Sequence, residues 1–252
     1  MIVNTENVGF ARATNQGIRI SRGRRILLLN NDTVVLPGAL ETMMDLMDRN
    51  PALGLLGCRL LNPDYSVQQS FGRMVSFVND FGRKFILNKL YRKYHNPLVR
   101  AYLDWLHSSP KEVDWVRGAC MLARREALVD VGLMDENFFM YLEDIDLGVG
   151  MRQLGWEVCF TPAAAVIHYE GASSAKNLFR TALEYRKSQL YFYKKHYGRS
   201  GLFRLRVYLY GKLFKLRLQS QIQRWMSRTS PAAIEETEKL NREIFRIVRD
   251  YR

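Results

Sequence analysis

Residues 138–147 read FFMYLEDIDL, an aromatic run followed at once by three carboxylates within four positions. Apolar Met140, Ile145 and Leu147 bracket the acids, which predicts that the segment lies against a core. Carboxylates crowded together at low dielectric repel one another, and one of them acquires a raised pKa. A general base that works near neutral pH arises in this way. A solvated acidic first turn of a helix, favoured by the helix dipole, explains the same residues, and both interpretations stay open on this stretch alone.

Strand-like and helix-like patterns alternate on both sides of this stretch. We predict strands at 1–4 (a strand end), 26–29, 54–61, 113–116, 119–122, 158–161 and 164–167, and helices at 8–20, 37–50, 125–131 and 144–154, with short surface helices within 82–109. The apolar run at 26–29 is typical of a strand buried in a parallel sheet. This order predicts an α/β sandwich with its site at the carboxyl ends of the strands.

The charge of the chain is unevenly distributed. Of its 252 residues, 38 are Lys or Arg and 25 are Asp or Glu, a net charge of +13, and the whole excess lies after residue 171. This asymmetry predicts a neutral body, residues 1–171, followed by a basic region, residues 172–252.

The basic region is predicted to form helices at 178–197, 202–226 and 232–251. In the second, Phe203, Val207 and Phe214 share an apolar side, while Arg204 and Lys215 line another. Such a helix binds an anionic membrane surface, and it equally packs on a protein body. A nucleic-acid arm is a third interpretation that rests on charge alone. Because the region has no recognised nucleic-acid motif, we expect no nucleic acid as a partner.

The cysteines and the hydropathy of the chain indicate its cellular compartment. The cysteines Cys58, Cys120 and Cys159 are scattered through apolar segments, which predicts buried thiols in a reducing cytosol. No apolar run reaches the length of a membrane span, and no signal peptide is evident at the start. We therefore expect a cytoplasmic protein.

Two polar groups follow predicted strands, where open α/β sheets bind their ligands. Asn30-Asn31-Asp32 follows the strand at 26–29, and His168 ends the strand at 164–167. A carboxylate at that edge can hold a hard divalent cation that clamps phosphate oxygens. Each feature also has an ordinary structural explanation, a turn for Asn-Asn-Asp and a core histidine for His168. Together with the acid cluster, they predict a metal site beside a base.

The motifs that run from Asn4 to Ser174 resemble family 2 glycosyltransferases of GT-A fold, most closely the rhamnosyltransferase branch of bacterial cell-surface polysaccharide assembly. The matching segments are NVGFA (7–11) with Asn15 and Gly17, LNNDT (29–33) with PGA (37–39), VRGACML (116–122) with Arg124 and Arg125, DENFFMYLEDIDL (135–147), Arg152, GW (155–156), PA (162–163), and HYEG (168–171) with Ser173 and Ser174.

The resemblance implies a site and a chemistry. The implied roles are a Mg²⁺ or Mn²⁺ ligand for Asp32 and for His168, donor contacts for Asn15, Asn30, Asn31 and Asp32, the base for Asp144 with Glu143 orienting it, and the acceptor side for Trp115, Gly118 and Ala119. One base and one metal without a protein nucleophile imply a single displacement with inversion. The implied donor is a nucleotide sugar, and the implied acceptor is a glycan or a lipid-linked glycan at the inner face of the plasma membrane.

The family's first strand and helix, which grip the donor nucleotide, would precede Met1. We therefore expect this chain alone to associate through exposed strand edges, to bind donor weakly and to transfer little sugar. An inactive truncated remnant that binds a membrane or a partner is the alternative function.

Overall fold

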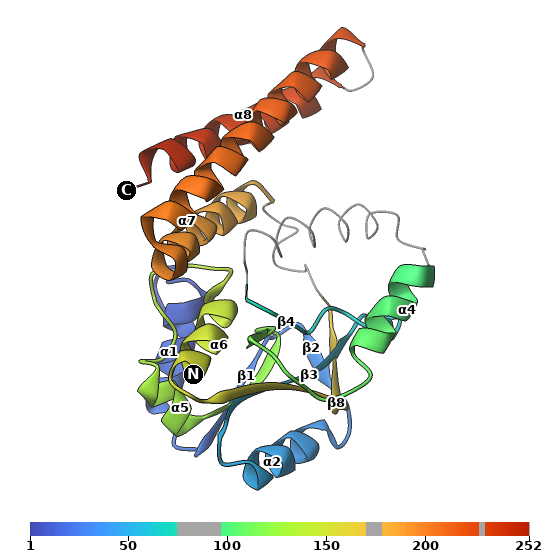
Figure 1. Cartoon of the computed structure of the whole chain (residues 1–252), viewed down its shortest axis with the longest axis vertical. Helices are drawn as coiled ribbons and strands as arrows, with labels where there is room; N and C mark the ends of the chain where they lie inside the picture. The colour runs from blue at the N-terminus through green and yellow to red at the C-terminus, as the bar shows by residue number, and fades with distance from the viewer. Residues whose placement is uncertain (75–96, 170–177, 227–229, 252) are drawn as a thin grey trace. The chain divides into compact units, whose positions relative to one another are not determined.

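The computed structural model describes residues 1–74, 97–169, 178–226 and 230–251 (Figure 1). Its elements in chain order are α1 (Phe10–Ile20), β1 (Arg25–Leu29), β2 (Thr33–Val35), α2 (Ala39–Arg49), β3 (Leu53–Leu61), β4 (Phe71–Gly72), α4 (Pro97–Leu106), β5 (Lys111–Glu112), β6 (Trp115–Val116), β7 (Cys120–Arg124), α5 (Arg125–Asp130), α6 (Glu143–Gln153), β8 (Glu157–His168), α7 (Leu178–Trp225) and α8 (Pro231–Asp250).

The elements form two compact units. One unit comprises Met1–Glu136 and Glu143–Ala172, and the other comprises Asn137–Leu142 and Ser173–Arg252. The aromatic residues at 138–141 therefore belong with the C-terminal helices, and the ring centroids of Phe138 and Tyr191 lie 4.9 Å apart in an edge-to-face arrangement. The predicted boundary after residue 171 lies outside the described ranges and stays a prediction.

A mixed sheet with strand order β1-β7-β3-β8-β2 forms the centre of the first unit, and β5 pairs with β8. Strands β3 and β8 run parallel, whereas β1 and β3 are antiparallel to β7 and β2 is antiparallel to β8. The parallel environment predicted for 26–29 is therefore wrong, because β1 finds its partner in the antiparallel strand β7. The separate strand pair β4–β6 flanks the sheet.

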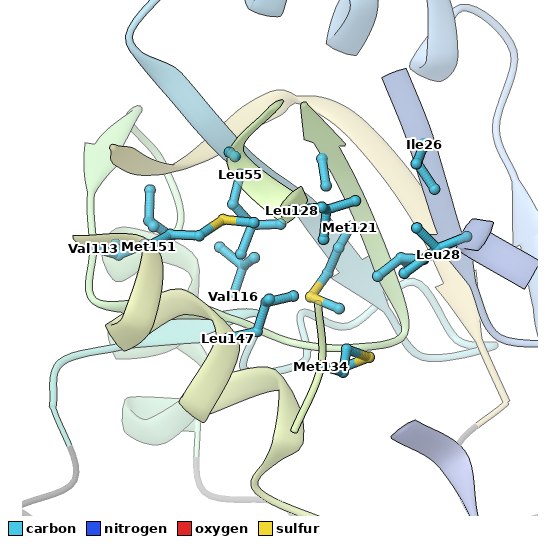
Figure 2. Packing of buried hydrophobic residues seen from close by; sticks show 14 of the residues in the cluster. Ile26, Leu28, Leu55, Val113, Val116, Met121, Leu128, Met134, Leu147 and Met151 are labelled. Atoms are coloured by element: carbon cyan, nitrogen blue, oxygen red, sulfur yellow. The ribbon is translucent and has the colours of Figure 1, made fainter. Parts of the chain in front are cut away.

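Two hydrophobic clusters cover the two faces of this sheet. Successive residues of β3 point to opposite faces of the sheet, as the two-residue period of a strand requires. Leu55 therefore packs in the first cluster and Leu56 in the second. Figure 2 shows the first cluster, to which Met121 of β7 and Leu147 and Met151 of α6 all belong. Helix α2 covers the other face through Met43 and Met47. This three-layer arrangement confirms the predicted α/β class.

Strand β8 continues through a bulge where two separate strands were predicted. Its pairing with β3 moves from Cys58↔Thr161 to Arg59↔Ala165, so β8 advances four positions while β3 advances one. Pro162 lies in this bulge, where a residue without an N–H is tolerated. The odd number of extra residues moves the later residues to the other face, which is why Phe160 packs in the first cluster and Val166 in the second.

Other predicted elements differ from the structure in their limits. Residues 1–4 form no strand and are exposed, because no described strand offers them hydrogen-bonding partners. Strand β2 was missed, and 113–116 contributes only Trp115 and Val116 to a strand. Of the short helices predicted within 82–109, α4 is observed, while 82–96 lies outside the described residues. Helix α7 merges the first two predicted C-terminal helices and contains a break at Gly198, whose φ is 61°.

Glycine is required where β3 meets β6. A Cβ on Gly57 would lie 2.5 Å from Cβ of Val116, which is closer than carbon atoms approach in real structures. A side chain here would push β6 away from the sheet.

His107, just after α4, is completely buried and neutral. Its Nδ1–H donates to the Leu103 carbonyl at 2.8 Å, and its Nε2 accepts from the Ser70 backbone N–H at 3.1 Å. Its ring lies against Phe71 and Phe160. Burial lowers the pKa of His107 below its usual value.

We predict that acid destabilises the protein partly through His107. The neutral ring contributes stability above the ordinary histidine pKa of about 6.5, and this contribution is lost as the pH falls below it. His107→Gln cannot titrate and should show a shallower fall in the free energy of unfolding between about pH 7 and pH 5. Urea unfolding at several pH values measures this, with His196→Gln as the control. Parallel curves for the parent and His107→Gln would contradict the assignment.

Candidate active site

The acid cluster lies at the first turn of α6, directly after two strained residues. Tyr141 and Leu142 have φ values of 74° and 71°, a conformation that costs an L-residue about 1–2 kcal/mol. Consecutive left-handed residues reverse the chain sharply, so that α6 begins at Glu143. Such strain is typical of functional sites.

Asp144 is held by two backbone donors. Its Oδ2 accepts from the Gly118 N–H at 2.9 Å, and its Oδ1 accepts from the Ile145 N–H at 2.8 Å. Burial raises the pKa of Asp144, and the two N–H donors act in the opposite direction because they stabilise the carboxylate. The effect of burial is the larger of the two, and the two donors fix the orientation of the carboxyl group.

Glu143 is buried, with 8% of its surface exposed. Its Oε2 has no hydrogen-bond partner within the described ranges. Burial, followed by the charge of Asp144, raises the pKa of Glu143 to about 8. Near pH 7, Glu143 therefore keeps its proton. The raised pKa expected for this stretch is confirmed, and a solvated acidic turn is excluded because Glu143 and Asp146 are both buried.

A close contact with β6 holds α6 in this position. A Cβ on Gly148 would lie 2.7 Å from the Asp114 carbonyl oxygen and 2.9 Å from Cα of Trp115. Trp115 is buried, and its Nε1–H donates to the Arg73 carbonyl at 2.9 Å. The structure thus gives Trp115 a packing role, and its acceptor role stays a prediction.

The pairing of β2 with β8 brings Asp32 to His168. Thr33 is the register partner of His168, and the Tyr169 N–H donates to the Asp32 carbonyl at 2.9 Å. Asp32 Oδ1 consequently lies 3.4 Å from His168 Nε2. Two side chains that are 136 positions apart in the sequence meet, as the predicted metal site requires.

A chain of side-chain hydrogen bonds determines which nitrogen of His168 carries the proton. The Ser66 hydroxyl donates to Asp64 and must accept from Asn62 Nδ2 at 2.8 Å. Asn62 Oδ1 then faces Gln68 Nε2 at 2.8 Å, and Gln68 Nε2 also donates to the His168 carbonyl at 2.8 Å. Gln68 Oε1 is left to accept from His168 Nδ1–H at 3.0 Å. In a neutral ring the lone pair is then on Nε2, the atom nearest Asp32.

This donor set fits a divalent cation. In the neutral ring, Nε2 of His168 and Oδ1 of Asp32 are both ligand atoms of the kinds that bind divalent cations, and they lie 3.4 Å apart. A histidine whose other nitrogen donates to an oxygen is also the usual arrangement for a metal ligand. In the part of the chain that the structure describes, no third His, Cys, Asp or Glu completes a cluster. Phosphate oxygens and water would supply the remaining ligands, as is common for Mg²⁺.

Gly118 and Ala119 connect the two halves of the site. The Asn30 N–H donates to the Ala119 carbonyl at 3.0 Å, while the adjacent Gly118 N–H donates to Asp144. Asn31 is exposed in the turn that Thr33 Oγ1 closes on the Asn30 carbonyl at 2.6 Å. The loop at 30–32 and the acid cluster therefore share one backbone link.

Asn15 makes its contacts elsewhere. Its side chain donates to the Met134 carbonyl and to Glu136, and accepts from the Met134 N–H, at 2.8 to 3.0 Å. It is buried on α1. These bonds fasten the loop before the acid cluster, and a donor contact through Asn15 stays a prediction.

Sequence reasoning missed Gln68 and Asn62, because neither lies in a recognised motif. The β-branched run Thr33-Val34-Val35 was the available signal for β2, and recognising it would have placed Asp32 beside a neighbouring strand.

Comparison with known proteins defines the class. Residues 1–185 match the family described as Glycosyltransferase like family 2. Because the match covers most of the chain, the protein belongs to this family, and its GT-A-like fold is confirmed.

The relatives are bacterial. The chain is 31% identical over 175 residues to an N-acetylglucosaminyl-diphospho-decaprenol L-rhamnosyltransferase of Mycobacterium tuberculosis, with 69% of this chain and 56% of the relative covered. It is 29% identical over 144 residues to the rhamnosyltransferase WbbL of Escherichia coli, with 57% and 52% covered. The chain thus spans about half the length of these relatives. Among solved structures, it is similar to a mannosyltransferase from Pyrobaculum calidifontis, at a TM-score of 0.46 and 14% identity over 77% of this chain and 45% of that one.

We predict that Glu143→Gln changes the pH dependence of stability. The pKa of Glu143 is raised from 4.5 to about 8 by folding, so the parent loses stability as the pH rises between these values. The variant should lack this loss and be more stable than the parent near pH 8, by roughly a few kcal/mol. Urea unfolding from acid to alkaline pH measures the difference, with exposed Glu126→Gln as the control. A constant difference between Glu143→Gln and the parent across the range would contradict a buried, protonated Glu143.

We predict that Gln68→Leu removes the hydrogen bond that keeps the proton of His168 on Nδ1. The imidazole ¹⁵N shifts of the parent should report a proton on Nδ1, and the variant should show mixed tautomers. Affinity for Mn²⁺ should fall by about 10- to 100-fold, the usual effect of losing such a partner. Gln69→Leu is the matched control, since the Gln69 side chain donates to the Phe71 carbonyl instead. An unchanged His168 spectrum in Gln68→Leu would contradict the proposed chain of hydrogen bonds.

Proposed function

We propose that this chain supplies the catalytic machinery of an inverting glycosyltransferase that moves a sugar from a nucleotide-diphosphate donor to a hydroxyl group. The observation that carries the proposal is the pair of adjacent acids, in which buried Glu143 has a pKa raised to about 8 and the carboxyl group of Asp144 is oriented by two backbone N–H donors. Membership of glycosyltransferase family 2 supports the reaction class.

Asp144 is the general base in this proposal. It takes the proton of the acceptor hydroxyl as the oxygen forms its bond to the anomeric carbon. The bond from that carbon to the donor phosphate breaks, and its electron pair leaves with the diphosphate. Attack and departure on opposite faces of the sugar give inversion. The protonated Glu143 adds no second negative charge beside Asp144, which limits the repulsion that would otherwise protonate the base.

Asp32 and His168 are the proposed ligands of Mg²⁺ or Mn²⁺. A bound cation would compensate the negative charge that develops on the departing diphosphate. Asn30 and Asn31, in the same turn as Asp32, are proposed to contact the donor, as is Asn15. Trp115, Gly118 and Ala119 are proposed for the acceptor side, beside Asp144.

The substrates are proposed from the relatives. The name of the Mycobacterium tuberculosis relative specifies rhamnosyl transfer and N-acetylglucosaminyl-diphospho-decaprenol. We propose a glycan or lipid-linked acceptor in bacterial cell-surface polysaccharide synthesis, at the inner face of the plasma membrane. No helix within the described ranges is long and apolar enough to span a bilayer. An anionic membrane surface is the proposed partner of the C-terminal region.

An inactive remnant that binds a membrane or a partner is the alternative function. It is distinguished by donor binding, because a remnant has no reason to retain a metal-dependent affinity for nucleotide sugars. Calorimetric titration with candidate donors and Mn²⁺ measures this affinity directly.

We predict that Asp144→Asn lowers transfer by a factor on the order of 10² to 10⁴, since the amide keeps the shape of the side chain but cannot accept the proton. Donor affinity should stay close to that of the parent. Initial rates and donor titrations measure the two effects separately. Asp45→Asn, the same change on the exposed side of α2, is the control. Transfer at the parental rate by Asp144→Asn would show that another group is the base.

A further inference from the structure

The second half of α7, from Gly198 to Trp225, has two apolar faces. On one face, Leu202, Leu205 and Leu209 are buried. Helix α7 packs with α8, whose buried residues are Ile234, Ile244 and Val248, and the rings of Tyr210 and Phe245 meet in this contact. Burial accounts for this side of the helix.

The opposite face is exposed. Its members, called here the exposed stripe, are Phe203, Val207, Phe214, Leu218, Ile222 and Trp225. Their exposed fractions run from 43% at Leu218 to 86% at Trp225. At about 100° per residue they fall within an arc of about 100°, centred almost opposite Leu205 and Leu209. A run of large apolar side chains this exposed marks an interaction surface.

Basic residues border the exposed stripe. Arg204 and Lys215 follow one edge, Arg217 follows the other, and all three are exposed. Between residues 198 and 225 there is no Asp or Glu. The nearby acid Glu238 of α8 is itself within 3.3 Å of Arg224. The stripe thus lies within a positive field that favours an anionic partner.

We propose that the exposed stripe inserts into the surface of an anionic lipid bilayer, with this half of α7 lying in the plane of the membrane. Apolar side chains flanked by Lys and Arg are the pattern of an interfacial helix, and basic residues near anionic headgroups add to the attraction. A nucleic acid would use the charges and leave the six apolar side chains in water. The inference deepens the membrane partner of the proposed function, and does not depend on catalysis.

Vesicle flotation of the full chain tests the proposal. Vesicles of phosphatidylcholine with phosphatidylglycerol are compared with vesicles of phosphatidylcholine alone. The stripe variant is Phe214→Gln, Leu218→Gln and Trp225→Gln together, which is not expected to disturb folding because all three side chains are exposed. The matched control changes three exposed apolar residues of the other unit, Ile20→Gln, Val129→Gln and Leu154→Gln.

The parent should bind the phosphatidylglycerol vesicles, and added salt should weaken binding. The stripe variant should lose at least about tenfold in partition coefficient, while the matched control should bind like the parent. Brominated lipid should quench Trp225 fluorescence, and the quenching should decrease in Trp225→Phe.

Equal binding by the parent and the stripe variant would overturn the proposal. So would a parent that ignores vesicles and instead forms oligomers that the stripe variant abolishes, since the stripe would then join copies of the chain. Transfer to a soluble acceptor, measured separately, reports on the proposed function, so failure of one is distinguishable from failure of the other.

Discussion

The bulge of β8 is the constraint on which the first unit depends. Strand β8 pairs with β3 along its length, with β5 near its start and with β2 at its end. Because the bulge adds an odd number of residues, Phe160 faces one hydrophobic cluster and Val166 the other. The same shift sets the register at which His168 meets β2, and therefore its distance from Asp32. A regular strand would exchange the faces and separate these two side chains.

The electrostatics of the site depend on the different environments of two adjacent acids, Glu143 and Asp144. Oε2 of Glu143 is buried without a hydrogen-bond partner, whereas the carboxyl group of Asp144 accepts two backbone hydrogen bonds. The two members of this crowded pair therefore lie in different environments, although the pKa of each is raised by burial. The strained residues Tyr141 and Leu142 fix where α6 begins, and Gly148 lets it approach β6 closely enough for Asp144 to reach Gly118.

The C-terminal helices differ from a simple amphipathic helix pair, because α7 has two apolar faces. In the second half of α7, one apolar face is buried and the other is exposed to solvent. Both faces are built from the same kinds of residue. A helix that packed on one partner only would need a single apolar face. The exposed apolar face lowers solubility, and binding to an external partner explains why it is present together with its basic borders.

The sequence by itself determined the α/β class, most helices within a few residues, the acid cluster and the nomination of Asp32 and His168, because local periodicity and strand-end chemistry are written in neighbouring residues. Only the tertiary structure decided that β1 lies antiparallel to β7, that β2 exists, that Gln68 orients His168, that Glu143 is the buried acid, and which face of α7 stays exposed. Each of these depends on a partner far along the chain, such as Asn62 and Gln68 for His168 or α8 for α7. Burial and hydrogen bonding are properties of pairs, and a single stretch of sequence contains only one member of each pair.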